Sequence, residues 1–223
     1  MCIRDRVVDV PIAPDSYLYD NAATAYYYNL ADAKAYLQQA GYADTDGDGF
    51  VDNNGTALSL TIIVNQNAAN NVRAAAARLA AQQLENVGIR ATVQELSYDA
   101  YEKALKAGNF DLAFCGFEMG ADYDLSFLLK SGAERNYGRF SSSTMDALLG
   151  KCSSAVGEAA LKTAYADLQS AFLEQLPILP LYYSTNTLVV RDTIKNVAGV
   201  RDRDIYRTVV DWYMYQQGEG QTN

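Results

Sequence analysis

The chain has 223 residues, of which 49% are hydrophobic and 20% are charged, so it has enough apolar material for one large or two small domains. Its net charge of −9 provides no basic stripe to neutralise phosphates, which excludes nucleic acid as the expected partner. The chain has no histidine, which excludes His-ligated zinc and nucleophiles activated by a histidine base.

The first residues and the cysteines carry little functional signal. The opening letters MCIRDR resemble a translated adapter sequence, so we expect residues 1–6 to be a non-native start. No apolar region follows that would predict a signal peptide, and no stretch approaches the roughly 20 apolar residues of a membrane span. The cysteines match neither a CxxC pair nor a disulfide framework; they are Cys2, Cys115 and Cys152. Cys115 is predicted to be a small buried residue.

An acidic stretch follows the first predicted helix. The letters LADAKAYLQQAGY predict a helix that ends at Gly41, and DTDGDGFVDNNG follows at residues 44–55. Read as a calcium loop, the stretch offers carboxylates at the first, third, fifth and ninth positions, which are Asp44, Asp46, Asp48 and Asp52. The twelfth position is Gly55, where a calcium loop has a bidentate glutamate. We therefore favour an acidic turn, with calcium as the single candidate cofactor.

A strand–helix–strand unit is predicted next. Residues 58–64 become continuously apolar, as a buried strand does, and residues 89–96 alternate in character. Between them, Asn70 or Asn71 begins a helix that Gly88 ends. Its predicted buried face consists of Val72, Ala76, Leu79, Ala80, Leu84 and Val87. A right-handed crossover would make the two strands parallel.

The remaining elements continue the alternation and then become helical. A helix over 98–107 is stopped by Gly108, and FDLAFCGF at 110–117 predicts a third strand. A polar, glycine-bearing loop follows, with one short helix near 125–130. Two more helices are predicted over about 144–155 and 158–175. In LPILPLYYSTNTLVVR the prolines indicate the entry or edge of an extended segment.

Several blocks of the sequence resemble one family in order and spacing. They are AKAYLQQAGYADTDGDG, QLENVGIRATVQEL, YEKALKAGNFDL, ADYDLSFL, RNYGRFSSSTMDALL and LPILPLYY. Together they resemble the C-terminal half of the family 5 extracellular solute-binding proteins, the oligopeptide, dipeptide and nickel receptors of ABC importers. The acidic stretch belongs to that pattern, since family members often carry such a bend between a helix and the first strand of the C-terminal lobe.

The resemblance implies a fold and a division of the chain. The implied fold class is α/β, a periplasmic-binding-protein-like lobe with βαβ units around a mixed sheet, plus a C-terminal return segment that belongs to the other lobe. We expect a hinge-proximal segment at 7–30, the C-terminal lobe at 31–176 and the return segment at 177–223. Because family members have two complete lobes, we expect this chain to be a fragment with weak solute affinity on its own.

The resemblance also implies a function. It is that of a receptor without enzymatic activity, which binds short peptides or similar solutes in an interlobe cleft and delivers them to a membrane permease. Nickel is disfavoured because histidine, its strongest nitrogen ligand, is missing. The expected protein is a monomer, periplasmic or extracellular and associated with the cell envelope, touching the membrane only through a lipid anchor or the permease.

The stretch GFEMGADYD carries the first candidate ligand-binding residues. In the family, an acidic residue in a segment of the form W-x-A-D-Y pairs with the ammonium group of a peptide. Asp122 takes the position of that acid, Tyr123 follows it, and Phe117 replaces the usual tryptophan with extra spacing. The alternative for Asp122 is a turn or capping aspartate before the helix near 125–130.

A second group of candidates lies in the loop NYGRF. Aromatic and arginine side chains in a loop can face a binding cleft, and those in this loop are Tyr137, Arg139 and Phe140. The alternative is a loop that simply packs under the helix containing Met145.

Two other classes of function remain open on the sequence. A glycosidase would use paired carboxylates, and Glu118 and Asp122 are the nearest pair. A calcium-stabilised extracellular interaction module would be built on the acidic stretch at 44–52, and its melting temperature would rise with calcium.

Overall fold

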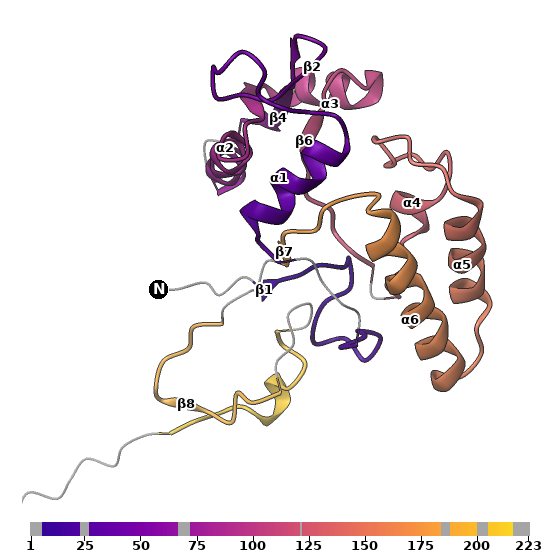
Figure 1. Ribbon diagram of the computed structural model, residues 1–223. Helices are drawn as coiled ribbons and strands as arrows, with labels where there is room; N and C mark the ends of the chain where they lie inside the picture. Colours follow the sequence, from indigo (N-terminus) through magenta and orange to yellow (C-terminus); the bar gives the residue numbers. More distant parts are fainter. Residues whose placement is uncertain are drawn as a thin grey trace, which may run out of the picture. The chain divides into compact units, whose positions relative to one another are not determined.

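The computed structural model describes residues 6–22, 27–66, 72–120, 122–183, 188–199 and 205–215. The predicted caps Asn70 and Asn71 lie outside these residues. The chain divides into two compact units, each drawn in Figure 1. The first combines Met1–Tyr19 with Leu179–Asn223, and the second is Asp20–Ile178.

The second unit contains a three-stranded parallel sheet. Strand β4 (Ser59–Asn65) lies between β5 (Arg90–Leu96) and β6 (Leu112–Phe114), and both neighbours run parallel to it. Helix α2 (Val72–Glu85) connects β4 to β5, which confirms the predicted βαβ unit. We expected a mixed sheet, and the three strands of this sheet in the described ranges are all parallel. The third strand ends at Phe114, short of the predicted 117.

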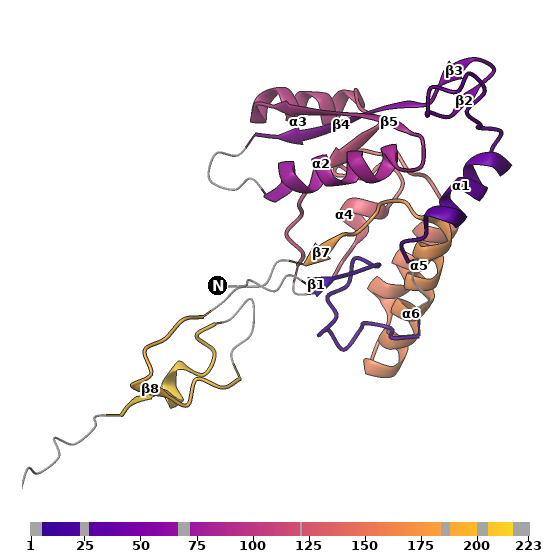
Figure 2. The ribbon, with the colours of Figure 1, turned by 60° about the vertical axis from the view of Figure 1, so that its left-hand side comes forward.

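Helices α2 and α3 (Tyr98–Ala107) cover opposite faces of this sheet (Figure 2). The cause is the period of two along β4, which points Ile62 and Val64 to one face and Ile63 to the other. The first face packs on the alanines of α2, and the second packs on Tyr101 and Leu105 of α3. Burial of both faces explains why β4 is continuously apolar.

The predicted buried face of α2 is confirmed only at its end. Val87 is buried just after the helix, and Leu84 packs against the cluster that contains Ile62 and Val64. Val72 and Leu79 are instead 51% and 55% exposed, and the buried residues of the helix are Ala74, Ala77 and Ala81. Alanine methyl groups let the helix approach the sheet closely, while branched side chains on β4 supply the volume between them. In this alanine-rich helix, therefore, the small residues face the core.

A helix and a small hairpin precede the sheet. Asn29 begins α1 (Leu30–Gln39) by accepting hydrogen bonds from the amides of Ala31 and Asp32. The acidic stretch leads from α1 into β2 (Asp52–Asn53), which pairs with β3 (Thr56–Ala57). The predicted helix and the predicted turn are both confirmed.

Three helices complete the second unit. They are α4 (Ser126–Leu129), α5 (Ser143–Ser154) and α6 (Glu158–Gln175), close to the predicted positions. Ser142 caps α5 by accepting a hydrogen bond from the Met145 amide. In α6, Tyr165, Leu168 and Phe172 are among the buried residues.

The first unit is built from short antiparallel pairs. Strand β1 (Arg6–Val7) pairs with β7 (Tyr182–Tyr183), which begins just after the two prolines, as predicted. Strand β8 (Ile194–Lys195) pairs with β9 (Tyr213–Met214), and the 3-10 helix η1 (Val209–Asp211) precedes β9. Within the described residues, no helix is both long and apolar enough to cross a membrane.

Candidate functional site

The carboxyl edge of the parallel sheet brings polar groups from distant parts of the chain together. Asn65 ends β4, Cys115 and Gly116 follow β6, and Arg73 lies at the start of α2. In open α/β sheets, ligands bind outside the carboxyl ends of the strands. This edge, with the loop that leaves β6 toward α4, is therefore the candidate functional site.

Helix α6 contacts the loop that contains Asp122. The hydroxyl of Tyr165 lies 3.1 Å from the carbonyl oxygen of Tyr123 and 3.3 Å from that of Asp122. Tyr123 has a φ of 54°, a left-handed conformation that few side chains adopt without support. At Gly120, a Cβ would lie 2.4 Å from Oδ1 of Asp122, so another residue there would displace the Asp122 side chain. One hydroxyl of α6 thus holds the carbonyl groups of both Asp122 and Tyr123.

The side chain of Asp122 is exposed and only partly used. Its Oδ1 accepts a hydrogen bond from the Asp124 amide at 3.2 Å, and the structure gives its Oδ2 no partner among the described residues. The capping role belongs to Asp124, which accepts from the Ser126 amide at 2.9 Å at the start of α4. Asp122 therefore makes a local turn and keeps hydrogen-bonding capacity for another group.

Phe117 lies in the same loop and packs against α4. Its ring meets that of Phe127 edge-on, with 6.2 Å between centroids and 66° between planes. The neighbouring Glu118 is exposed. Phe117 thus holds the loop against α4.

The NYGRF residues are engaged in local structure. The Tyr137 ring packs against the cluster around Ile63, and its hydroxyl accepts a hydrogen bond from Arg135 at 3.2 Å. The Arg139 guanidinium donates to the Ala107 carbonyl at 2.9 Å, at the C-terminal end of α3.

The backbone of Phe140 is held on both sides by one residue. Its amide donates to the Asn136 side chain at 3.0 Å, and its carbonyl accepts from the same side chain at 2.7 Å. Together with the engagement of Tyr137 and Arg139, these contacts favour the packed-loop alternative.

Sequence reasoning missed Arg73. Its Nη1 lies 3.5 Å from Oδ1 of Asn65, and its guanidinium lies against Gly116, where a Cβ would come within 2.1 Å of Nη2. A lone arginine after a strand and a loop gives little signal, because the glycine that admits it follows a different strand, β6.

Two further groups near this edge are uncharged at neutral pH. The Tyr101 hydroxyl donates to the Phe114 carbonyl at 2.8 Å and lies 3.1 Å from Sγ of Cys115. Burial raises the pKa of the Tyr101 hydroxyl and the pKa of the Cys115 thiol. Cys115 is therefore not an activated thiolate, and neither group neutralises Arg73.

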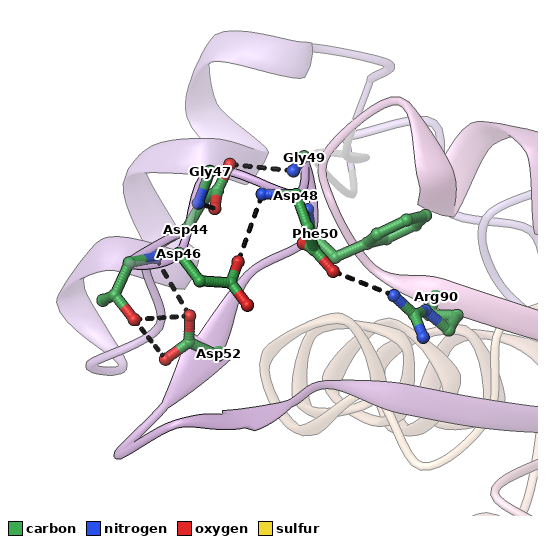
Figure 3. A network of polar contacts seen from close by, with 9 residues as sticks. Asp44, Asp46, Gly47, Asp48, Gly49, Phe50, Asp52 and Arg90 are labelled. Carbon is green, nitrogen blue, oxygen red and sulfur yellow. Dashed lines mark hydrogen bonds and ion pairs between the residues drawn. The ribbon is translucent and has the colours of Figure 1, made fainter.

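The acidic stretch gathers three exposed carboxylates, shown in Figure 3. One oxygen each of Asp44, Asp46 and Asp48 lies within 4.8 Å of the others. Asp44 accepts hydrogen bonds from the amides of Gly47 and Gly49 at 2.7 and 3.0 Å. Asp46 accepts from the Asp48 amide at 3.1 Å. Asp44 and Asp46 thus both satisfy the backbone of their own turn.

The third carboxylate, Asp48, is bound on both oxygens. One accepts from the Phe50 amide at 2.8 Å and the other from Arg90 at 3.1 Å. The Arg90 guanidinium also stacks over the Phe50 ring, 4.4 Å from its centroid. The turn is thereby joined to the start of β5.

Asp52 lies apart from this group. It is 6% exposed and accepts hydrogen bonds from the amide and hydroxyl of Thr45, at 2.8–2.9 Å, and from the Gly55 amide at 3.2 Å. The bonds from Thr45 are the main cause that lowers the pKa of its carboxyl group. Asp52 therefore closes the turn and does not join the three-carboxylate cluster.

Comparison with known proteins identifies relatives of the chain. Residues 5–138 match the model of bacterial extracellular solute-binding proteins, family 5 Middle. The oligopeptide-binding protein AppA of Bacillus subtilis (strain 168) is 27% identical over 218 residues, which cover 94% of this chain and 39% of AppA. The periplasmic murein peptide-binding protein MppA of Escherichia coli (strain K12) is 26% identical over 167 residues, 74% of this chain and 29% of MppA.

Comparison with solved structures also finds AppA. The structure of AppA in complex with a nonapeptide superposes with a TM-score of 0.74 at 24% identity, covering 95% of this chain and 43% of that chain. The expected periplasmic-binding-protein-like fold is thereby confirmed. The chain spans about two fifths of the length of AppA.

Proposed function

The chain belongs to family 5 of the bacterial extracellular solute-binding proteins, and on that basis we propose that it is part of a receptor that captures short peptides for an ABC importer. The observation that carries the proposal is the match over residues 5–138, joined to two relatives that are named for peptide binding. In this proposal, the solute binds at the carboxyl edge of the sheet in the second unit.

The geometry of the Asp122 loop supports a peptide as the solute. An ammonium group needs acceptors, and Asp122 presents a carboxylate oxygen without a partner among the described residues. A carboxylate–ammonium contact is a charge-assisted hydrogen bond, stronger than a neutral one. Because the loop is held by Tyr165, little conformational freedom would be lost on binding.

We propose that the receptor does no chemistry. Members of the family are binding proteins. The carboxylates of a glycosidase include an acid whose pKa is raised by an apolar pocket, whereas Glu118 and Asp122 are both exposed.

The proposed partners follow from the same role. The receptor docks as a monomer on the permease subunits of the importer, and it works in the periplasm or, carried by a lipid anchor, at the outer surface. Sequencing the DNA upstream of Val7 tests the proposed export. We expect the reading frame to continue into a further lobe and an export signal.

Calorimetric titration of the full-length receptor with di- to pentapeptides tests the function. We expect saturable binding and no cleavage of the peptides after prolonged incubation. Absence of binding to the whole series, with circular dichroism showing a folded protein, would overturn the proposal, and so would release of hydrolysed product.

A further inference from the structure

A buried glutamine of α6 holds a distant part of the chain. Gln169 is 1% exposed, and a buried amide costs free energy unless both of its ends are hydrogen-bonded. Its Oε1 accepts a hydrogen bond from the amide of Asp20 at 3.1 Å, and its Nε2 donates to the carbonyl of Tyr165 at 2.9 Å. A leucine would fill this core position without any polar group to satisfy. What glutamine adds here is therefore the bond to Asp20.

This bond lies where the chain passes between its two compact units. Asp20 is the first residue of the second unit. The chain leaves that unit after Ile178, shortly beyond the end of α6. Leu176 ends the helix in a left-handed conformation, with a φ of 44°. Helix α6 therefore holds both connections to the first unit, one through Gln169 and one through its own C-terminal end.

The same face of α6 holds the loop of the candidate site. The hydroxyl of Tyr165 donates to the carbonyl oxygens of Asp122 and Tyr123. Tyr165 and Gln169 are four residues apart, which places their side chains on one face of the helix with about 5–6 Å between Cβ atoms. Both residues are buried. One helical turn thus separates the support of the solute loop from the support of the connection at Asp20.

We propose that α6 couples the Asp122 loop to the connection at Asp20, with Tyr165 and Gln169 as positioning residues. The inference rests on the proposed function, because it takes this loop as the place where the solute ammonium binds. A solute that orders the loop also fixes the Tyr165 side chain, and with it the turn of α6 that carries Gln169. The bond between Asp20 and Gln169 is then formed for more of the time.

The coupling is reciprocal. By linkage, the factor by which the bond between Asp20 and Gln169 strengthens solute binding equals the factor by which bound solute strengthens that bond. The two factors are measured independently, one as an affinity and the other as an exchange rate.

Hydrogen exchange of the Asp20 amide in the full-length receptor tests the coupling. The probe is an alanine tripeptide at saturating concentration, and exchange is followed with and without it by mass spectrometry of short fragments that contain Asp20. In wild type, the peptide should slow exchange at Asp20 by about fivefold or more. The Asp52 amide, which donates to the Ala43 carbonyl, is the reference and should exchange at the same rate in both samples.

Tyr165→Phe separates the coupling from solute binding. The variant removes the hydroxyl that holds the loop and keeps the ring in the core. With peptide again at saturation, the slowing at Tyr123 and Asp124 should remain, while the slowing at Asp20 should disappear. If Tyr165 had a purely structural role, the peptide would still slow exchange at Asp20.

Gln169→Met provides the reciprocal measurement. Methionine has a similar length and volume but cannot accept from the Asp20 amide, so the affinity for the tripeptide should fall by the factor that the exchange experiment gives. Leu168→Met, at a neighbouring buried position of α6, is the matched control and should leave the affinity unchanged. Calorimetric titration measures the affinities, and thermal melts check that each variant is folded.

The outcomes distinguish the two proposals. If the peptide binds wild type but leaves exchange at Asp20 unchanged, or if Tyr165→Phe keeps the full slowing there, the coupling is overturned and the peptide receptor stands. If wild type binds no peptide, both proposals fall. Should Gln169→Met fail to fold, the exchange result for Tyr165→Phe still decides.

Discussion

The acidic turn at 44–55 and the carboxyl edge of the sheet are both rich in charged groups, yet they use them differently. In the turn, Asp44, Asp46 and Asp48 accept backbone amides, and Arg90 pairs with Asp48. At the edge, Asp122 has one local hydrogen bond and Arg73 has one long contact. Density of charge alone therefore does not identify a site here, and we propose that hydrogen-bonding capacity left unused by the protein is the better guide.

The largest expected effect is at Asp122. Asp122→Asn should weaken binding of a free-amine tripeptide by about tenfold to a hundredfold, because a charge-assisted bond becomes a neutral one. Asp46→Asn, also exposed but used by its own turn, should leave the affinity unchanged. Calorimetric titration measures both. Equal affinities in the two variants would break the comparison between edge and turn.

A smaller effect is expected at Gly116. Gly116→Ala should displace the Arg73 guanidinium at the edge where the solute is proposed to bind, and lower the affinity for an alanine tripeptide by about tenfold. The fold should survive, since the clashing atoms are the far end of a flexible side chain. Gly150→Ala is the control, because a Cβ there meets nothing within 4 Å. An affinity equal to that of wild type would show that the solute does not reach this edge.

The turn should show its effect in stability. Hydrogen bonds lower the pKa of Asp52 in the folded protein below the ordinary value of 3.8, so the unfolded chain binds the proton more readily. The stabilisation is complete above the ordinary pKa and is lost as the pH falls through the folded pKa. Urea unfolding of wild type should therefore show a steeper loss of stability below about pH 3.8 than Asp52→Asn does. Parallel pH profiles would contradict this role.

Calcium should have the smallest effect. The twelfth position is Gly55 and Asp52 is committed to Thr45, so a calcium ion would have few ligands in the turn. We expect the melting temperature with millimolar calcium to equal that with a chelator at matched ionic strength. A clear rise with calcium would revive the calcium-stabilised module.

Much of the fold follows from local sequence signals. Helix α3 occupies the predicted 98–107 because Gly108, with a φ of 75°, provides the left-handed C-terminal position. The apolar run of β4 and the alternation of β5 predict their pairing. The buried face of α2 was not predictable from hydrophobicity, because the sheet contacts its alanines.

The candidate site was less predictable for a physical reason. The resemblance indicated Asp122, whereas Arg73 acquires its meaning from Gly116, which is distant in sequence and adjacent only in the fold. The sequence pattern made Arg139 a candidate, but in the fold its guanidinium donates a hydrogen bond to the Ala107 carbonyl. Local patterns show which groups are polar, and tertiary contacts decide which of them remain available.

The most direct test is a crystal structure of the full-length receptor with a bound alanine tripeptide. The account predicts the peptide ammonium within hydrogen-bond distance of Oδ1 or Oδ2 of Asp122. A peptide whose ammonium contacts other groups, with Asp122 facing solvent, would contradict the claim that unused charge at the sheet edge defines the site.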